Sequence, residues 1–241
     1  MISKLFHLPG QGLARYFTHL LDLLYPRLCL ACSTALPIGE EVLCLFCRHK
    51  LPVTDYHLMK DNPFSERFWG RLPLHSGTSL YHFNKGGKVQ HLIHELKYHH
   101  QPEIGRQLGK IHGRLLKDSP WFSGVQLILP VPLHPRKQHK RGYNQSAQYA
   151  VGLAEGMEVP WSDHHLFRTN YTDTQTAKSR LERFDNVREV FALKQTATLE
   201  NKHVLLVDDV ITTGATLEAC GQHLLQVPGL TLSMATIAFA S

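Results

Sequence analysis

The chain has 241 residues, enough for one ordinary domain and a small additional module. Apolar residues make up 43% of it, which is typical of a folded globular protein and excludes a largely disordered chain. Lysine and arginine outnumber aspartate and glutamate by 26 to 20; this net charge of +6 favours anionic ligands such as phosphates or nucleic acid, although it is also common at this size. The longest apolar runs fall well short of the roughly 18 residues that span a bilayer, so the sequence predicts no membrane insertion.

The first 52 residues predict a short helix followed by a cysteine module. Leucines and Phe17 recur at helical spacing over residues 12–24, and Pro26 ends the pattern. Charged residues interrupt this stretch and no small-residue cleavage site follows it, so we do not interpret it as a signal peptide. We therefore expect a cytoplasmic protein.

Four of the five cysteines form two C-x-x-C pairs separated by eleven residues, Cys29 with Cys32 and Cys44 with Cys47. In a chain without a signal peptide, this pattern favours a bound metal over disulfides. Two such pairs can place four thiolates tetrahedrally around a structural Zn²⁺, and a redox dithiol is the alternative. The fifth, Cys220, falls within a predicted helix and is expected to pack as a small apolar residue.

From residue 78 onward, strand and helix patterns alternate along the chain. The alternation indicates an α/β domain over residues 78–241, with a mostly parallel sheet flanked by helices and a ligand site at the carboxyl ends of the strands. Residues 53–77 are interpreted as a connector or as a hood over that site. The predicted strands cover 78–83, 125–131, 164–168, 189–193, 204–207 and 230–239, and the predicted helices cover 88–98, 102–116, 144–156 and 215–225.

The most informative segment follows the predicted strand at 204–207. Two carboxylates, Asp208 and Asp209, come directly after it, and residues 212–216 then open a helix with the sequence TTGAT. Small residues let the backbone approach an anion, and the unpaired amides and the dipole at a helix start favour negative charge. The three threonine hydroxyls add donors, and each charge-assisted hydrogen bond contributes roughly 1.5–3 kcal/mol. The segment therefore predicts a site for a phosphate monoester.

The two carboxylates require a separate explanation, because they would repel a phosphate. They are good acceptors for a pair of hydroxyl groups such as a ribose 2′,3′-diol, and a phosphate site beside a diol site describes a ribose 5-phosphate. Adjacent strand residues point to opposite faces, so Asp208 and Asp209 can face one ligand only if the chain leaves strand geometry there. The alternative is an ordinary helix cap with two exposed acids at a strand end.

Residues 204–216, VLLVDDVITTGAT, resemble the motif with which type I phosphoribosyltransferases bind 5-phosphoribosyl 1-pyrophosphate. Nearly the whole chain is similar to the ComF family of bacterial competence and DNA-utilisation proteins, which joins a four-cysteine module to a phosphoribosyltransferase domain. The resemblance implies a type I phosphoribosyltransferase-like fold, a zinc-ribbon-like N-terminal module, and a ligand that is bound with Mg²⁺. Its landmarks are the four cysteines, residues 96–98 (LKY), 130–134 (PVPLH) and 141–145 (RGYNQ), Arg168, Thr169, Gln175 and residues 204–216.

The resemblance also implies a role for each part of this motif. Asp208 and Asp209 would act as catalytic residues that hold the ribose hydroxyls. The 5′-phosphate would be bound by the loop at the helix start, which comprises Thr212, Thr213, Gly214, Ala215 and Thr216.

Residues 134–141 (HPRKQHKR) are predicted to form a basic loop, which places a run of cations between the predicted strand at 125–131 and the predicted helix at 144–156. In a transferase, the leaving pyrophosphate gains negative charge as its bond to ribose C1 breaks, and fixed cations stabilise that transition state more than the ground state. Mg²⁺ would share this task. Alternatively, the run is a solvated charged surface. The candidates are Arg136 and Arg141 as catalytic residues and Lys97 and Lys140 as substrate-binding residues, with Lys137 beside them.

Residues 169–188 are polar and carry several lysines and arginines. By resemblance, this segment is the loop that closes over the active site and excludes water from it. Alternatively, residues 179–184 form a surface helix whose charges have no role in the site.

Together these features predict a phosphoribosyltransferase-type protein that binds 5-phosphoribosyl 1-pyrophosphate with Mg²⁺ and acts in natural competence, DNA uptake or DNA utilisation. In a full reaction, a nucleophile such as a nitrogen base would displace pyrophosphate. Two alternatives stay open: a module that senses the phosphoribosyl ligand or handles single-stranded DNA without turnover, and a zinc-dependent scaffold for a partner in DNA uptake. The sequence does not disclose the acceptor or the oligomeric state.

Overall fold

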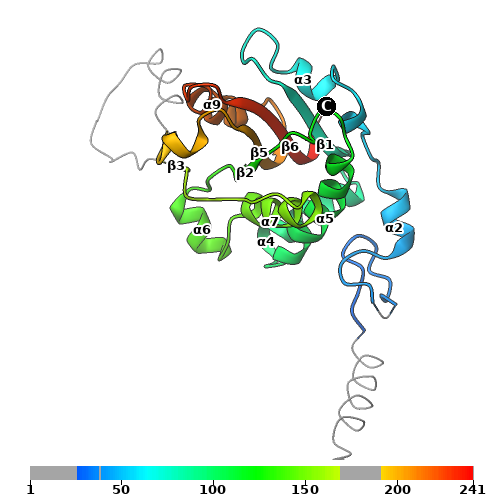
Figure 1. The fold of residues 1–241 in the computed structure, drawn as a ribbon. Helices are drawn as coiled ribbons and strands as arrows, with labels where there is room; N and C mark the ends of the chain where they lie inside the picture. The colour runs from blue at the N-terminus through cyan, green and yellow to red at the C-terminus, as the bar shows by residue number, and fades with distance from the viewer. Residues whose placement is uncertain (1–25, 38, 169–190, 241) are drawn as a thin grey trace, which may run out of the picture. The chain divides into compact units, whose positions relative to one another are not determined.

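The computed structural model describes residues 26–37, 39–168 and 191–240 (Figure 1). The chain divides into two compact units, Met1–Lys50 and Leu51–Ser241. Two predicted segments, the helix at 12–24 and the polar segment at 169–188, lie outside the described residues. Within the described part of the chain, no helix is both long enough and apolar enough to cross a membrane.

Within residues 26–37 and 39–50, the described part of the smaller unit, the chain forms one short helix, α2 (Leu45–Lys50), and an antiparallel bridge between Leu28 and Ala35. In these residues Val42 and Leu43 are almost fully buried together with two of the cysteines. An apolar cluster of this size does not stabilise a fold by itself, and small modules usually depend on a metal or on disulfides. The cysteines are therefore the natural centre of this unit.

The larger unit is built on a four-stranded sheet in the order β1-β6-β5-β2, in which every neighbouring pair is parallel. This confirms the predicted mostly parallel sheet. Residues 204–207 of the central strand are completely buried, as is usual for a strand that is covered by helices on both faces. The strands are β1 (Ser76–Phe83), β2 (Leu127–Pro130), β5 (His203–Ile211) and β6 (Thr231–Ala240).

Helices cover both faces of this sheet (Figure 1). One face carries α4 (Lys88–Tyr98), α5 (Pro102–Lys117) and α7 (Gln145–Met157), and the opposite face carries α9 (Ala215–Leu224). The remaining elements are short: η1 (Tyr56–Leu58), α3 (Pro63–Glu66), α6 (Pro135–Arg141), η3 (Thr196–Leu199), and an antiparallel pair formed by β3 (Leu166–Arg168) and β4 (Phe191–Leu193).

Helices α5 and α7 approach each other closely because glycines line their contact. A Cβ atom on Gly152 would lie 1.9 Å from the carbonyl oxygen of Arg106, and one on Gly109 would lie 2.3 Å from that of Tyr149. Real Cβ contacts are never this short, so a larger residue at either position requires the helices to move apart. This packing fixes the start of α7, which lies at the site described below.

The segment between the two predicted domains packs as part of the larger unit. Phe64 and Phe68 are fully buried and belong to the same hydrophobic cluster as Leu206 and Met234 of the sheet, whereas the nearby Trp69 is exposed. The Asn62 side chain caps α3 and also donates to the Gly77 carbonyl oxygen at 2.9 Å. Residues 51–77 are thus held against the sheet by both apolar and polar contacts.

Two predicted elements differ from the observed ones. The strand expected at 204–207 continues through both aspartates to Ile211, because β5 stays paired with β6 along that length. Residues 135–141, expected as a basic loop, form helix α6 instead. Pro135 supplies a preset backbone angle in the first turn, the His134 side chain accepts from the Arg136 amide, and Gly142 ends the helix in the left-handed conformation.

Candidate functional site

Asp208 and Asp209 line one cavity of about 190 Å³ at the carboxyl ends of β2 and β5. We expected both side chains to face one ligand only if the chain left strand geometry; this expectation was wrong, because both residues lie within β5. The Asp208 carboxylate accepts the amide of Asp209 at 2.8 Å, so this side chain turns along the strand and not straight away from it. The other lining residues include Lys97, Lys137, Arg141, Asn144, Gln145, Ser146, Arg168 and Thr216.

Asp209 is buried and uses both of its carboxylate oxygens. Its Oδ1 forms an ion pair with Nζ of Lys97 at 2.9 Å, and its Oδ2 accepts from Nε2 of Gln145 at 3.4 Å. These partners come from the end of α4 and the start of α7. A carboxylate that is held from two sides in a buried position is preorganised to accept hydroxyl groups in one orientation.

Asp208 lies in a different electrostatic setting from its neighbour. Burial, and then the negative charge of Asp209, raise the pKa of Asp208 to about 7. The hydroxyl of Ser146, which donates to Oδ1 at 2.8 Å, works in the opposite direction but does not cancel these effects. Near neutral pH the Asp208 carboxyl is therefore partly protonated, and the acidic pair carries less than two full negative charges.

The start of α7 positions the residues that contact the two aspartates. Asn144 caps the helix by accepting the amide of Ser146, and it also donates to the Val131 carbonyl oxygen at 2.9 Å, which ties the helix start to the end of β2. The Tyr143 hydroxyl donates to the Leu96 carbonyl oxygen and so connects the same segment to α4. Sequence analysis used residues 141–145 as a family landmark without recognising this positioning role.

The predicted phosphate loop connects β5 to α9. Gly214 adopts the left-handed conformation (φ 82°), and a Cβ atom there would lie 3.1 Å from the buried ring of Phe68. Glycine is thus required both by backbone angle and by space. Of the five predicted loop residues, Thr216 lines the cavity of the aspartates, while Thr212 and Thr213 are exposed beside it.

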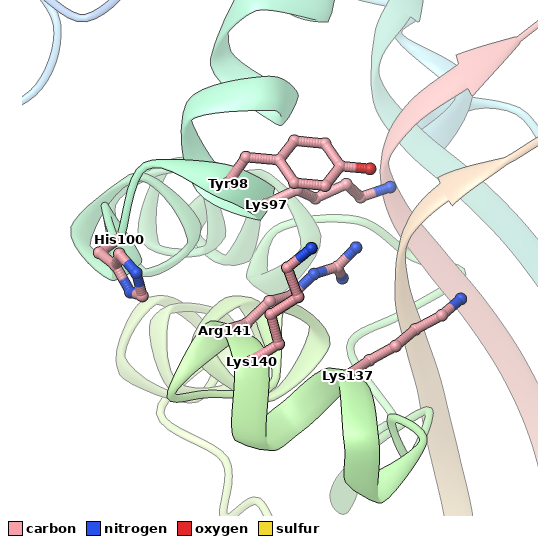
Figure 2. Close-up of a pocket in the computed structure, with 6 residues that line it drawn as sticks. All are labelled: Lys97, Tyr98, His100, Lys137, Lys140 and Arg141. Carbon is pink, nitrogen blue, oxygen red and sulfur yellow. The ribbon is translucent and has the colours of Figure 1, made fainter.

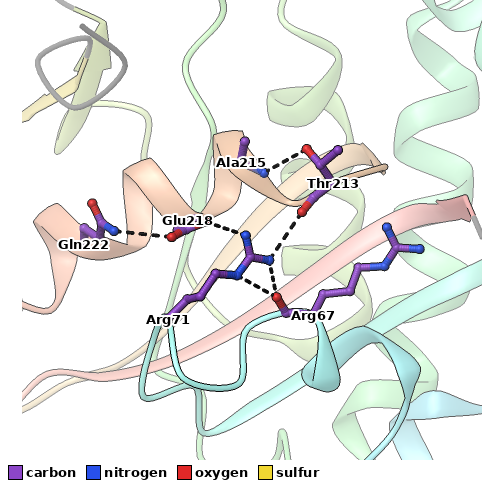
Figure 3. Close-up of polar contacts among 6 residues, drawn as sticks. All are labelled: Arg67, Arg71, Thr213, Ala215, Glu218 and Gln222. Carbon is purple, nitrogen blue, oxygen red and sulfur yellow. Dashed lines mark hydrogen bonds and ion pairs between the residues drawn. The ribbon is translucent and has the colours of Figure 1, made fainter. Parts of the chain in front are cut away.

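Arg71 holds this loop from outside, a contact that sequence analysis did not predict. Its guanidinium pairs with the Glu218 carboxylate at 2.7 Å, donates to the Thr213 carbonyl oxygen at 3.4 Å, and donates to the Arg67 carbonyl oxygen at 2.9 Å (Figure 3). The segment around residues 67–71 therefore supports the loop and the first turn of α9. Nothing local in the sequence indicates that Arg71 and Glu218 meet.

A second cavity, of about 250 Å³, is lined by cations from α4 and α6. Figure 2 shows Lys140 and Arg141 extending from α6 toward Tyr98 and Lys97 at the end of α4. The Arg141 guanidinium lies 5.3 Å from the centre of the Tyr98 ring, a cation–π distance. The lining residues are Lys97, Tyr98, His100, Lys137, Lys140 and Arg141.

The two cavities share Lys97, Lys137 and Arg141, so the cationic surface continues into the acidic site. Lys137, which the sequence placed beside the candidate residues, lines both cavities. Arg136 lies on the same exposed helix but is not among the residues that line either cavity. The geometry thus places cationic side chains and the two carboxylates side by side.

The four cysteines of the smaller unit gather at one point, with their sulfur atoms all within 4.8 Å of one another. Cys32 and Cys44, which come from different pairs, have sulfurs 3.7 Å apart, close to the roughly 3.8 Å that tetrahedral Zn–S bonds of about 2.3 Å would give. Backbone amides of Cys44 and Cys47 donate to the sulfurs of Cys29 and Cys44. This donor set fits a single tetrahedral metal ion, because it joins both pairs and does not leave each as a separate dithiol.

Known proteins resemble this chain over much of its length. Residues 144–240 match the family model described as phosphoribosyl transferase domain. The chain is 28% identical over 222 residues to DNA utilization protein YhgH of Escherichia coli (strain K12). This match covers 83% of this chain and 92% of that protein. The resemblance to the ComF family is confirmed.

Two further ComF-type relatives carry competence names. Competence protein F of Haemophilus influenzae is 33% identical over 130 residues, covering 52% of this chain and 57% of that protein. Competence protein ComFC of Bacillus subtilis is 27% identical over 206 residues, covering 83% of this chain and 78% of that protein.

Solved structures also resemble this chain, at low similarity. The glutamine phosphoribosylpyrophosphate amidotransferase from B. subtilis gives a TM-score of 0.40 at 20% identity over 58% of this chain. The present chain spans only 30% of the length of that enzyme. Adenine phosphoribosyltransferase from Saccharomyces cerevisiae gives a TM-score of 0.38 at 16% identity, covering 59% of this chain and 72% of that one.

Proposed function

We propose that this ComF-type protein binds 5-phosphoribosyl 1-pyrophosphate with Mg²⁺ through its phosphoribosyltransferase domain, in the cytoplasm, and acts in competence or DNA utilisation. The observation that carries the proposal is the juxtaposition of the buried acidic pair with a cationic cavity that shares Lys97, Lys137 and Arg141 with it. A ligand with a hydroxylated ring and a polyphosphate on one side of that ring matches this distribution of charge.

Each part of the ligand has a matching part of the site. Asp208 and Asp209 accept the ribose hydroxyls, and the amides and hydroxyls of residues 212–216 receive the 5′-phosphate at the start of α9. The pyrophosphate lies in the cationic cavity, where Lys140 and Arg141 face it. Arg136 contributes through its charge on the same helix and not through a place in the cavity lining.

The chemistry that follows is substitution at ribose C1. A nucleophile, such as a ring nitrogen of a base, forms the new bond to C1 while the bond to pyrophosphate breaks and the electron pair leaves with the pyrophosphate. Negative charge develops on the pyrophosphate in the transition state. The fixed cations therefore stabilise the transition state more than the ground state, and this difference lowers the barrier. Mg²⁺ bound with the ligand would supply further positive charge that stabilises the leaving pyrophosphate.

Zinc is proposed for the cysteine module, as a structural ion bound by Cys29, Cys32, Cys44 and Cys47. Its support is the fit of four converging sulfurs, beside which the described residues 26–37 and 39–50 bury few apolar side chains. Removal of the ion by a chelator is expected to unfold the module while the larger unit keeps its secondary structure.

A second candidate function is recognition without turnover, in which the same surface handles single-stranded DNA or the protein serves DNA uptake through a protein partner. The observation that favours DNA is Tyr98, which is 56% exposed beside a group of cations. Exposed aromatic rings flanked by basic groups provide stacking platforms for bases. Binding of an oligonucleotide would then weaken steeply with salt and compete with 5-phosphoribosyl 1-pyrophosphate.

The experiment that tests the proposal combines a thermal-shift titration with a pyrophosphate-release assay. The wild type should be stabilised by 5-phosphoribosyl 1-pyrophosphate with Mg²⁺, Asp209→Asn should lose that stabilisation, and the exposed control Asp118→Asn should keep it. Release across a panel of bases then separates an enzyme from a sensor. If the ligand stabilises the wild type and Asp209→Asn equally, the site assignment is wrong.

A further inference from the structure

A cluster of three metal-binding side chains lies at the end of α4, apart from the cysteine module. The ligand atoms of His94, Glu95 and His99 lie within 4.8 Å of one another. Nδ1 of His99 is 2.9 Å from Oε1 of Glu95, and the two imidazole rings are 5.1 Å apart between centres. The two histidines are exposed, while the Glu95 carboxylate is largely covered.

The donor set has the composition of a site for a borderline divalent metal. Two imidazole nitrogens and one carboxylate oxygen suit Zn²⁺ and its neighbours in the first transition series. A tetrahedral ion holds such atoms about 3.4 Å apart, so small side-chain rotations from the observed positions would complete the site. Three protein ligands leave one coordination position for water or an exchangeable ligand.

A simple ion pair explains only part of this geometry. Residues four apart on a helix often pair, and Glu95 with His99 is such a pair at the surface, where these contacts stabilise little. It does not account for His94, which lies next to Glu95 on the helix and whose ligand atom also comes within reach of both partners. Nδ1 of His91, one turn earlier, is 3.9 Å from the same Glu95 oxygen and adds a nearby fourth donor.

We propose that His94, Glu95 and His99 form a second metal site, which takes Zn²⁺ or a similar divalent ion independently of the four cysteines. The ring of His94 lies 4.9 Å from that of Tyr98, and Lys97 and Tyr98 line the cationic cavity. An ion at this position therefore fixes the last turn of α4, which forms one wall of that cavity. The proposal concerns metal binding alone and does not depend on the phosphoribosyl function.

The test uses full-length protein whose cysteine module is already loaded with zinc. Isothermal titration with Zn²⁺ should show one further equivalent bound, and His94→Gln combined with His99→Gln should weaken it at least tenfold. The matched control is His164→Gln. His164 is an exposed histidine 3.4 Å from the carboxylate of Asp163, and it lies outside the proposed cluster. This control should bind like the wild type.

Cobalt gives an independent readout. Co²⁺ added to the zinc-loaded protein should show weak visible bands without the intense near-ultraviolet bands of thiolate ligation, since imidazole and carboxylate are its ligands. The proposal is overturned if no further equivalent binds, if the double variant binds it unchanged, or if the cobalt spectrum carries thiolate bands. Circular dichroism of the variants verifies that these surface substitutions leave the fold intact.

Discussion

The acidic and the cationic cavities adjoin each other but are built in opposite ways. Asp208 and Asp209 lie on a central strand and are held by buried or half-buried partners on α4 and α7. Lys137, Lys140 and Arg141 extend from α6, a helix of seven residues with no buried side chain. The buried contacts fix the acidic cavity in one geometry. The long, exposed side chains of the cationic cavity can change their rotamers to fit a ligand. On the proposed function, the first cavity is a rigid site for the ribose and the second is an adaptable site for the pyrophosphate, which moves away as it leaves.

The largest expected effect comes from the packing beneath the rigid cavity. Gly152→Ala forces a methyl group to within 1.9 Å of the Arg106 carbonyl oxygen, so α5 and α7 must separate. We expect the free energy of unfolding to fall by about 3 kcal/mol, the upper end for overpacked sites, as measured by urea denaturation. Gly124→Ala is the control, because its nearest neighbour is a side-chain atom at 3.3 Å. An equal loss in both variants would contradict the packing argument.

The next effect compares the two cavities directly. Asp209→Asn should weaken binding of 5-phosphoribosyl 1-pyrophosphate at least tenfold with little dependence on salt, because it removes a buried, oriented acceptor and leaves Lys97 unpaired. Lys140→Gln should weaken binding only a few-fold and should reduce its salt dependence, because this cation is exposed and screened. Calorimetry at two salt concentrations measures both. The comparison fails if the lysine variant shows the larger, salt-independent loss.

A pH-dependent effect concerns Asp208. Its pKa of about 7 in the folded protein exceeds the value near 3.9 expected in the unfolded chain, so the folded state keeps a proton that the unfolded state releases. The contribution of this group to stability is therefore present below about pH 4 and is lost as the pH rises to about 7. Asp208→Asn should gain stability relative to the wild type when unfolding is measured at pH 8, and should gain less at pH 5. A constant difference at both pH values would refute the shifted pKa.

The smallest effect is expected at the support of the phosphate loop. Arg71→Gln removes the pair with Glu218 and the contact with the Thr213 carbonyl oxygen, both at the surface. Exposed pairs contribute about 0.2–1 kcal/mol, so stability should change little. The affinity for ribose 5-phosphate should fall two- to fivefold, with partial recovery in Arg71→Lys. A loss of stability without any change in affinity would show that Arg71 supports the fold and not the loop.

The sequence predicted those elements whose signal is local. The helix at 88–98 was predicted with its observed bounds, because its apolar periodicity and the following polar residues lie within one segment. The buried strand and glycine turn of residues 204–216 were also recognisable, since burial selects apolar residues in the strand and the left-handed conformation at Gly214 selects glycine. The convergence of the four cysteines, predicted from their spacing alone, is present in the structure.

Contacts between distant segments were not predictable in the same way. The pairing of Lys97 with Asp209 depends on the strand order, which brings the end of α4 beside the end of β5. The run at 134–141 was taken for a loop because its charges carry no apolar periodicity, although Pro135 and Gly142 are ordinary helix boundary signals. The contacts of Arg71 with the phosphate-loop segment gave no sequence signal, since Thr213 and Glu218 lie more than 140 residues further along the chain.

The position of Lys97 has a consequence for which molecules the protein would select. The same amine pairs with Asp209 and lines the cationic cavity, so the two cavities draw on one charge. Two separate ligands, a ribose phosphate and a free pyrophosphate, would compete for the interaction with Lys97. Each would also lose its own translational and rotational entropy on binding. A single molecule that carries both groups meets these costs once. On the proposed function, the shared lysine favours the intact donor over its two halves, so each fragment is held less tightly once the bond between them is broken.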